Sequence, residues 1–180
     1  MRMVALFCLL LCGTLALPGC STAPSSQAAR DTLSTDVQST IALFKRNDAS
    51  MNKLFESAYG YAVFPSIGKG AVGVGGAYGR GQVFEKGEMI GYCDVSQGSI
   101  GLQIGGQTYR QIIFFETHNA LYKFKYNEFT LAANASAVAA DSGSAATNNY
   151  SNGVLIFTMT RGGLMYEASI GGQQFTFEAK

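Results

Sequence analysis

Apolar residues recur along one stretch of the chain with the spacing of an amphipathic helix. Between Arg30 and Phe44, the residues Leu33, Val37, Ile41 and Phe44 follow one another at intervals of four, four and three. This spacing places the four side chains on one face of an α-helix. The pattern therefore predicts a helix with an apolar stripe from Arg30 to Phe44.

Charged residues mark the end of this predicted helix. Lys45 and Arg46 follow its last apolar position, where the negative end of the helix dipole favours cations. Asp48 is then placed to cap a second, shorter helix. In that helix four apolar residues share a face, namely Met51, Leu54, Phe55 and Ala58.

After Tyr59 the apolar period changes from about 3.6 to about 2, which is typical of β-strands. Pro65 has no N–H group, so it is expected to end the first strand. Residues 85–88 have the composition of a hairpin turn, and Asn119 is placed to cap a short helix between later strands. The expected strands are 61–64, 70–84, 89–93, 99–104, 109–115, 129–137, 154–159, 164–170 and 175–177.

Short strands joined by glycine-rich turns predict a meandering sheet. The chain has 22 glycines, several of them inside the expected strands, where glycine permits sharp bends and close approach of backbones. Residues 30–180 are long enough for one domain with its own core. We therefore predict a single α+β domain, with N-terminal amphipathic helices followed by a curved, mostly antiparallel, barrel-like sheet.

Residues 1–19 have the pattern of a secretory signal. Arg2 supplies a positive charge, and residues 4–17 are almost wholly apolar. This apolar run is shorter than the roughly 20 residues of a transmembrane helix. It ends in Leu-Pro-Gly-Cys, which resembles the bacterial lipobox, in which the thiol of the cysteine, here Cys20, is acylated. Pro18 departs from the small residue usual at its position, and the alternative is an ordinary signal peptide with an incidental Cys20.

Acylation of Cys20 would fix where the protein acts. Two or more acyl chains, palmitate for example, hold a protein stably on a membrane. Ser21, rather than aspartate, follows the cysteine, and in lipoproteins this favours the outer membrane. Residues 20–29 are then the lipidated cysteine and a tether, since 21–29 contain no large apolar side chain. We expect a lipid-anchored protein of the bacterial envelope, facing the periplasm or the cell surface.

Charge and cysteine content exclude several classes of function. The chain has 13 Lys and Arg against 12 Asp and Glu, and removal of Arg2 with the leader brings the net charge close to zero. Nucleic acid is therefore not expected as a partner. Cys93 is the only cysteine beyond Cys20, so the domain has no internal disulfide.

No set of residues indicates an enzyme. His118 is the only histidine, with Glu116 near it in sequence, and a surface or turn role fits it better than general base catalysis. Cys93 stands beside Asp94, which would raise its pKa and not activate it. Residues 68–73 fit G-x-G-x-x-G but continue as a strand, so no dinucleotide is expected. We predict no catalytic residue, no metal site, and no cofactor other than the covalent lipid on Cys20.

Four blocks of the sequence resemble the SYLF domain family, which includes lipid-binding, actin-regulating proteins of eukaryotes and many bacterial lipoproteins. The resemblance covers about residues 31–180. The blocks are AYGYAVFPSIGKG at 58–70 with its glycine-rich continuation to Gly81, GLQIGGQ at 101–107, LAANAS at 131–136 and RGGLMYEAS at 161–169.

The resemblance implies binding to acidic phospholipids through an N-terminal amphipathic segment and nearby basic residues. In this sequence these are the helix from Arg30 to Phe44 and Lys69 in the first block. Phosphoinositides, the ligands in eukaryotes, are not expected in a bacterial envelope. The basic actin-binding stretch of the fungal members has no clear counterpart here.

Two main functions remain open. The first is binding of anionic lipid surfaces; its candidate residues are Arg30, Leu33, Val37, Ile41, Phe44, Lys45, Arg46, Lys53, Lys69 and Arg80. Four of these candidates are apolar, namely Leu33, Val37, Ile41 and Phe44. The alternative for them is that they pack on the core of the domain. The second function is binding of an envelope protein through aromatic residues. The alternative for these residues is that they belong to the core: Tyr59, Tyr61, Phe64, Tyr78, Phe84 and Tyr92. A small-molecule carrier with a pocket inside the sheet is a third, weaker possibility.

Overall fold

The computed structural model describes residues 21–72, 74–100, 107–126, 136–139, 145, 149–160, 168–169 and 172–180. Its helices are α1 (Gln27–Asn47), α2 (Met51–Ser57) and α3 (His118–Lys125). Its strands are β1 (Gly60–Val72), β2 (Val74–Glu85), β3 (Glu88–Ile100), β4 (Gln107–Phe115), β5 (Ser136–Ala139), β6 (Val154–Thr160), β7 (Ala168–Ser169) and β8 (Gln174–Ala179). The expected strands 99–104, 129–137 and 164–170 lie largely outside the described residues.

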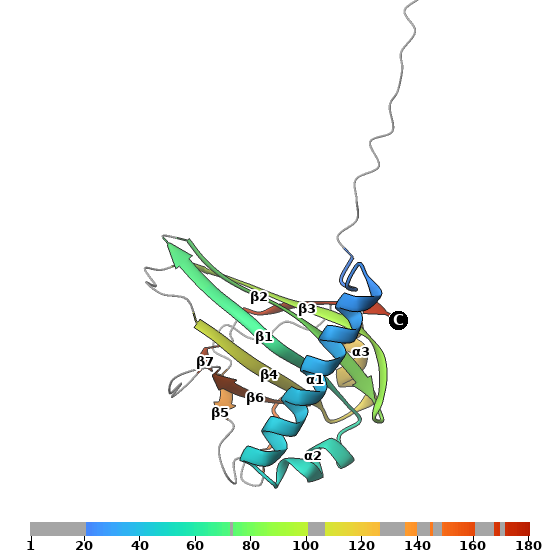
Figure 1. Cartoon of the computed structure of the whole chain (residues 1–180). Helices are drawn as coiled ribbons and strands as arrows, with labels where there is room; N and C mark the ends of the chain where they lie inside the picture. Colours follow the sequence, from blue (N-terminus) through green and yellow to red (C-terminus); the bar gives the residue numbers. More distant parts are fainter. Residues whose placement is uncertain are drawn as a thin grey trace, which may run out of the picture.

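The described strands form one sheet in the order β7-β5-β6-β4-β1-β2-β3-β8. Neighbours pair antiparallel except for β5 and β6, which pair parallel. This order ends at β7 and at β8, so the described strands do not close into a barrel. The predicted α+β domain with a mostly antiparallel sheet is confirmed, and α1 crosses one face of the sheet (Figure 1).

The sheet is strongly curved, as expected. The rings of Phe64 in β1 and Phe175 in β8 lie 5.9 Å apart between centroids, although β2 and β3 separate the two strands in the sheet order. Across the same interior, the amide Nε2 of Gln173 donates hydrogen bonds to the Tyr109 hydroxyl (3.0 Å) and to Oε1 of Gln111 (3.3 Å). These contacts require the sheet to curl until its two halves face each other.

The concave face of the sheet holds the first core. Phe64, Ile113 and Phe115 are fully buried there. Helix α3 adds Leu121 and Phe124 from its buried face, and the Phe124 ring lies 5.0 Å from that of Phe115. The interior of the curved sheet is therefore filled by side chains and α3.

The opposite face of the sheet holds a second core, covered by α1 and α2. Val37 and Phe44 of α1 have no exposed surface, and Leu33 and Ile41 pack against the same cluster. From α2, the ring of Phe55 meets those of Tyr61 and Phe114 edge to face at 5.0 and 4.9 Å. Of the two alternatives for the apolar stripe, the structure shows the one in which it packs on the sheet.

The prediction that Pro65 ends the first strand was wrong. β1 continues through Pro65 to Val72 and is a central strand, paired with β2 on one side and β4 on the other. Both pairings shift register at this point, between Val63 and Ser66 toward β2 and between Phe64 and Ile67 toward β4. A bulge on both sides removes the need for an N–H donor at the proline.

Helix caps also differ from the expectation. Ser50, not Asp48, is the N-cap residue of α2, and Thr117, not Asn119, caps α3 by accepting a hydrogen bond from the amide of Ala120. Asp48 is 2% exposed, and its carboxylate accepts hydrogen bonds from the amides of Ser50 (2.9 Å) and Ala145 (2.7 Å). It joins the end of α1 to a segment about 100 residues later, a role that local sequence does not reveal.

The packing of α1 makes Phe44 important for stability. Phe44→Ala should lower the free energy of unfolding by about 3–5 kcal/mol, because it leaves a cavity in the outer core. Gln38→Ala, at an exposed position of the same helix, should change it by less than about 0.5 kcal/mol. Urea denaturation of both variants measures the difference. Equal, small effects would mean that α1 is not packed on the sheet.

One strand glycine is required by close approach of the backbone. A Cβ at Gly81 would collide with the carbonyl oxygen of Val63 and lie 2.9 Å from Cδ1 of Phe64, whereas one at Gly98 would meet nothing within 4 Å. Gly81→Ala should therefore cost about 1–3 kcal/mol of stability or more. Gly98→Ala should be neutral or slightly stabilising, since alanine loses less chain entropy. Thermal and urea unfolding compare the pair, and a neutral Gly81→Ala would contradict the close approach.

Candidate functional site

Four cations gather at the C-terminal end of α1. Lys45 and Arg46 lie in its last turn, and Lys53 is exposed on the adjoining helix α2. The Lys45 ammonium lies 4.7 Å from the centroid of the Phe55 ring, which brings the two helices together. Arg46 shares a groove with Arg110 of β4. We call Lys45, Arg46, Lys53 and Arg110 the basic end.

The groove runs between α1 and the sheet and has a volume of about 350 Å³. Its position follows from the helical repeat, because residues three or four apart on α1 face the same strands. Two arginines and two hydroxyl groups supply hydrogen-bond donors, and one carboxylate stands among them. The lining residues are Asp36, Ser39, Thr40, Leu43, Arg46, Pro65 and Arg110.

Arg110 was not among the sequence candidates. Its neighbours Tyr109 and Gln111 are fully buried on the concave side of β4, so the period of two directs Arg110 to the face that α1 covers. It is the single charged residue in strand β4. A lone cation inside an otherwise uncharged strand was the signal that could have identified it.

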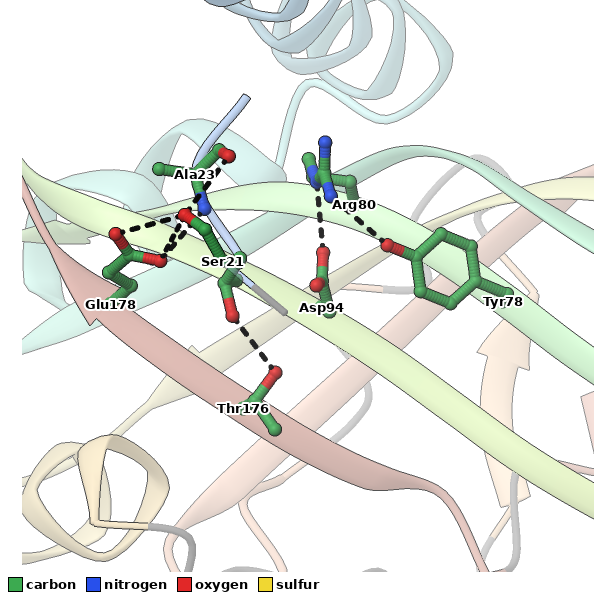
Figure 2. Close-up of polar contacts among 8 residues, drawn as sticks. Ser21, Ala23, Tyr78, Arg80, Asp94, Thr176 and Glu178 are labelled. Carbon is green, nitrogen blue, oxygen red and sulfur yellow. Dashed lines mark hydrogen bonds and ion pairs between the residues drawn. The ribbon is translucent and has the colours of Figure 1, made fainter. Parts of the chain in front are cut away.

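Arg80 belongs to a different contact. Its Nε donates to Oδ1 of Asp94 at 3.1 Å, and its Nη2 donates to the Tyr78 hydroxyl at 3.3 Å (Figure 2). Burial works against the charge of Arg80, but the hydrogen bond and the charge of Asp94 outweigh it and raise its pKa. Arg80 is therefore committed to an ion pair on the outer face of β2 and β3, away from the basic end.

Two further candidates lie elsewhere. Arg30, near the start of α1, donates from Nε to the carbonyl of Pro24 at 3.0 Å, and its guanidinium lies 5.8 Å from the Tyr92 ring centroid. Lys69 lies in β1, where its backbone pairs with Ala77 and Gln107, and its side chain is outside the description. The structure thus brings together Lys45, Arg46 and Lys53, and it does not place Arg30 or Arg80 with them.

The segment expected to be a tether contacts the sheet. Glu178 of β8 accepts hydrogen bonds at Oε2 from the Ser21 hydroxyl (2.9 Å) and from the Ala23 amide (3.0 Å) (Figure 2). These bonds, that of Ala23 foremost, lower the pKa of the Glu178 carboxyl. Thr22 reaches Thr176 at 3.3 Å. Residues 21–23 are therefore attached to β8, and α1 starts at Gln27.

The aromatic candidates for a protein interface are mostly core residues. Tyr61, Phe64, Phe84 and Tyr92 are at most 8% exposed, whereas Tyr78 is 54% exposed. The stacked rings of Tyr61 and Phe84, 4.8 Å apart, belong to the outer core. Tyr59 is half-buried, and its hydroxyl donates to Oε1 of Glu85 at 2.8 Å, a bond that raises the pKa of Tyr59.

Cys93 and His118, the two residues considered for catalysis, lie in different surroundings. Cys93 is fully buried in the inner core, and burial, followed by the charge of Asp94, raises the pKa of its thiol. His118 is exposed, with its ring 5.5 Å from that of Tyr59. Within the described ranges no three His, Cys, Asp or Glu side chains gather as a metal site. None of the helices in the described part of the chain combines the length and apolar composition needed to cross a membrane.

Known proteins share sequence with this chain. Residues 96–180 match the family model described as "Ysc84: Las17-binding protein actin regulator". The chain is also 26% identical, over 152 residues, to the Beta cell expansion factor A of Aeromonas veronii. That alignment covers 84% of this chain and 58% of the relative, so the chain spans less than two thirds of the curated relative's length.

The match agrees with three of the four sequence blocks. Those at 101–107, 131–136 and 161–169 fall inside the matched range, whereas the block at 58–70 precedes it. The resemblance to SYLF domains, a family of binding domains, is confirmed for this part. From residue 96 to residue 180, the chain is therefore similar in sequence to the Ysc84 family.

Proposed function

We propose that this protein is a membrane-anchored envelope lipoprotein whose domain binds anionic phospholipid surfaces through the basic end of α1. The observation that carries the proposal is the gathering of Lys45, Arg46, Lys53 and Arg110 beside a groove. With a net charge of only +1 on the whole chain, such a local cluster is the means by which the domain can attract anions.

The chemistry of the basic end suits phosphate groups. Guanidinium groups donate paired hydrogen bonds to phosphate oxygens, and Arg46 and Arg110 both line the groove. Each exposed cation near an anionic membrane contributes about 1 kcal/mol to binding. Arg46 and Lys53 are exposed, and Lys45 and Arg110 lie half-buried near them, which supports weak, salt-sensitive association. Asp36, which also lines the groove, would repel phosphate that approaches it.

Anchoring is a separate part of the proposal. Acylation of Cys20 would place lipid one residue before Ser21, which is attached to β8. Helix α1, with 21 residues, is about 30 Å long at 1.5 Å per residue. The basic end and the anchor therefore lie at opposite ends of α1, and their effects on membrane binding can be measured independently.

Charge reversal tests the lipid-binding part. The chain from Ser21 to Lys180 should sediment with vesicles containing phosphatidylglycerol at low salt, and it should not sediment with neutral vesicles or at high salt. Arg46→Glu with Lys53→Glu should weaken binding roughly 30-fold or more, because loss of two cations removes about 2 kcal/mol. Lys180→Glu, the matched control at the other end of the chain, should bind nearly as the parent does.

The opposite result would favour the alternative function. If the chain from Ser21 sediments with no vesicle, the domain does not bind lipid, and any membrane association belongs to Cys20. The alternative is then a non-enzymatic envelope protein that binds a protein partner. The description of the Ysc84 family, which names a protein-binding function, agrees with that alternative.

Substitution of Cys20 tests the anchor. The full chain expressed in bacteria should incorporate labelled palmitate and fractionate with membranes, whereas Cys20→Ala should abolish both, since it removes the acylated thiol. Cys93→Ala is the control, because that thiol is fully buried and should not be acylated. Label that persists in Cys20→Ala, or is absent from the parent, would show that Cys20 is not the anchor.

A further inference from the structure

A row of aromatic rings crosses one end of the curved sheet. His118, Tyr122 and Tyr126 follow one another at single-turn spacing along α3 and its C-cap residue. The ring centroids of His118 and Tyr122 are 6.1 Å apart, and those of Tyr122 and Tyr126 are 4.4 Å apart. Tyr59 continues the row, 5.5 Å from His118. We call these four residues the aromatic row.

The fold does not need the exposed part of this row. α3 packs into the inner core through Ala120, Leu121 and Phe124, which occupy its other face. Tyr122 and Tyr126 are 43% and 60% exposed, and in the described part of the chain only Tyr78 is a comparably exposed large apolar residue. Exposed apolar groups that lie together, unlike those scattered singly, are a feature of interaction surfaces.

The chemistry of the row fits the interfacial zone of a bilayer. A tyrosine has an apolar ring and a polar hydroxyl, so it is favoured where hydrocarbon meets headgroups. Lys123 and Lys125 lie in the last turn of α3, and lysines extend their ammonium groups toward lipid phosphates while their stems stay in apolar surroundings. A third lysine, Lys86, has its ammonium 5.4 Å from the Tyr59 ring centroid.

The row is also close to the point where the chain enters the domain. The Lys125 ammonium lies 5.6 Å from the ring centroid of Phe177 in β8. The next residue of that strand, Glu178, holds Ser21 on the opposite face. β8 is an end of the sheet order among the described strands. The C-terminal end of α3 and the N-terminal segment thus flank the same edge strand, at the corner marked C in Figure 1.

We propose that the aromatic row is the surface by which the anchored domain lies on its own membrane, with Tyr122 and Tyr126 at headgroup depth. This inference rests on the proposed anchoring through Cys20. Because Ser21 is attached to β8, an acyl chain on Cys20 holds the bilayer within a few residues' reach of that edge, about 3.8 Å per residue. The stripe of α1 cannot take this role while it is buried against the sheet.

A single tryptophan can report on this contact, because the chain contains none. Tyr126→Trp places the reporter in the row, and Tyr78→Trp places it at the exposed tyrosine of β2 as a matched control. The full-length acylated chain is reconstituted in vesicles of phosphatidylethanolamine and phosphatidylglycerol, with and without brominated acyl chains. The indole of the Tyr126→Trp variant should shift to shorter emission wavelength and lose most of its emission to the brominated lipid. The indole of the Tyr78→Trp variant should change little.

Several results would overturn the inference. Equal quenching in both variants, or none in either while the chains remain bound to the vesicles, means that the row is not the contact surface. An emission shift of the Tyr126→Trp variant with soluble peptidoglycan fragments, but not in vesicles, means that the row binds glycans. Loss of acylation, measured on the same preparations, identifies failure of the proposed anchoring through Cys20 instead.

Discussion

The central strand β1 is buried on both faces of the sheet. The rest of the structure depends on this, because each face needs its own layer of apolar side chains packed against it. Ala62 and Phe64 of β1 face the inner core, and Tyr61 and Val63 face the outer one. The sheet covers its concave face by curling around α3. It cannot cover the convex face in this way, so α1 and α2 must pack there. Each face of this sheet therefore has its own hydrophobic cover.

This constraint separates a buried side of α1 from a side that lines a groove. The side of the helix that carries Val37 and Phe44 is committed to the outer core. Arg46 and Asp36 lie at its boundary, where the helix meets the sheet and leaves a groove. A helix that looks amphipathic in the sequence can thus cover the sheet with one side and line a polar groove at its edge, without leaving the sheet.

Local patterns predicted much of this fold and less of its site. The sequence predicted the apolar stripe of α1 and the turn at Lys86 and Gly87, because helix faces and tight turns depend on neighbouring residues. Lys86 and Gly87 both have a positive φ in the structure. The continuation of β1 through Pro65 was not predicted, because two register shifts in adjacent strands accommodate the proline. Nor could the sequence place Arg110 beside Arg46, since their proximity depends on how α1 lies across β4.

The attachment of Ser21 to Glu178 joins residues 157 positions apart. This bond cannot form until β8 has been synthesised and paired with β3, long after the N-terminal segment has emerged from the ribosome. Until then, the backbone around position 21 is not attached to the sheet. Completion of the sheet then holds the same segment against the edge strand, so the two ends of the described domain become fixed together.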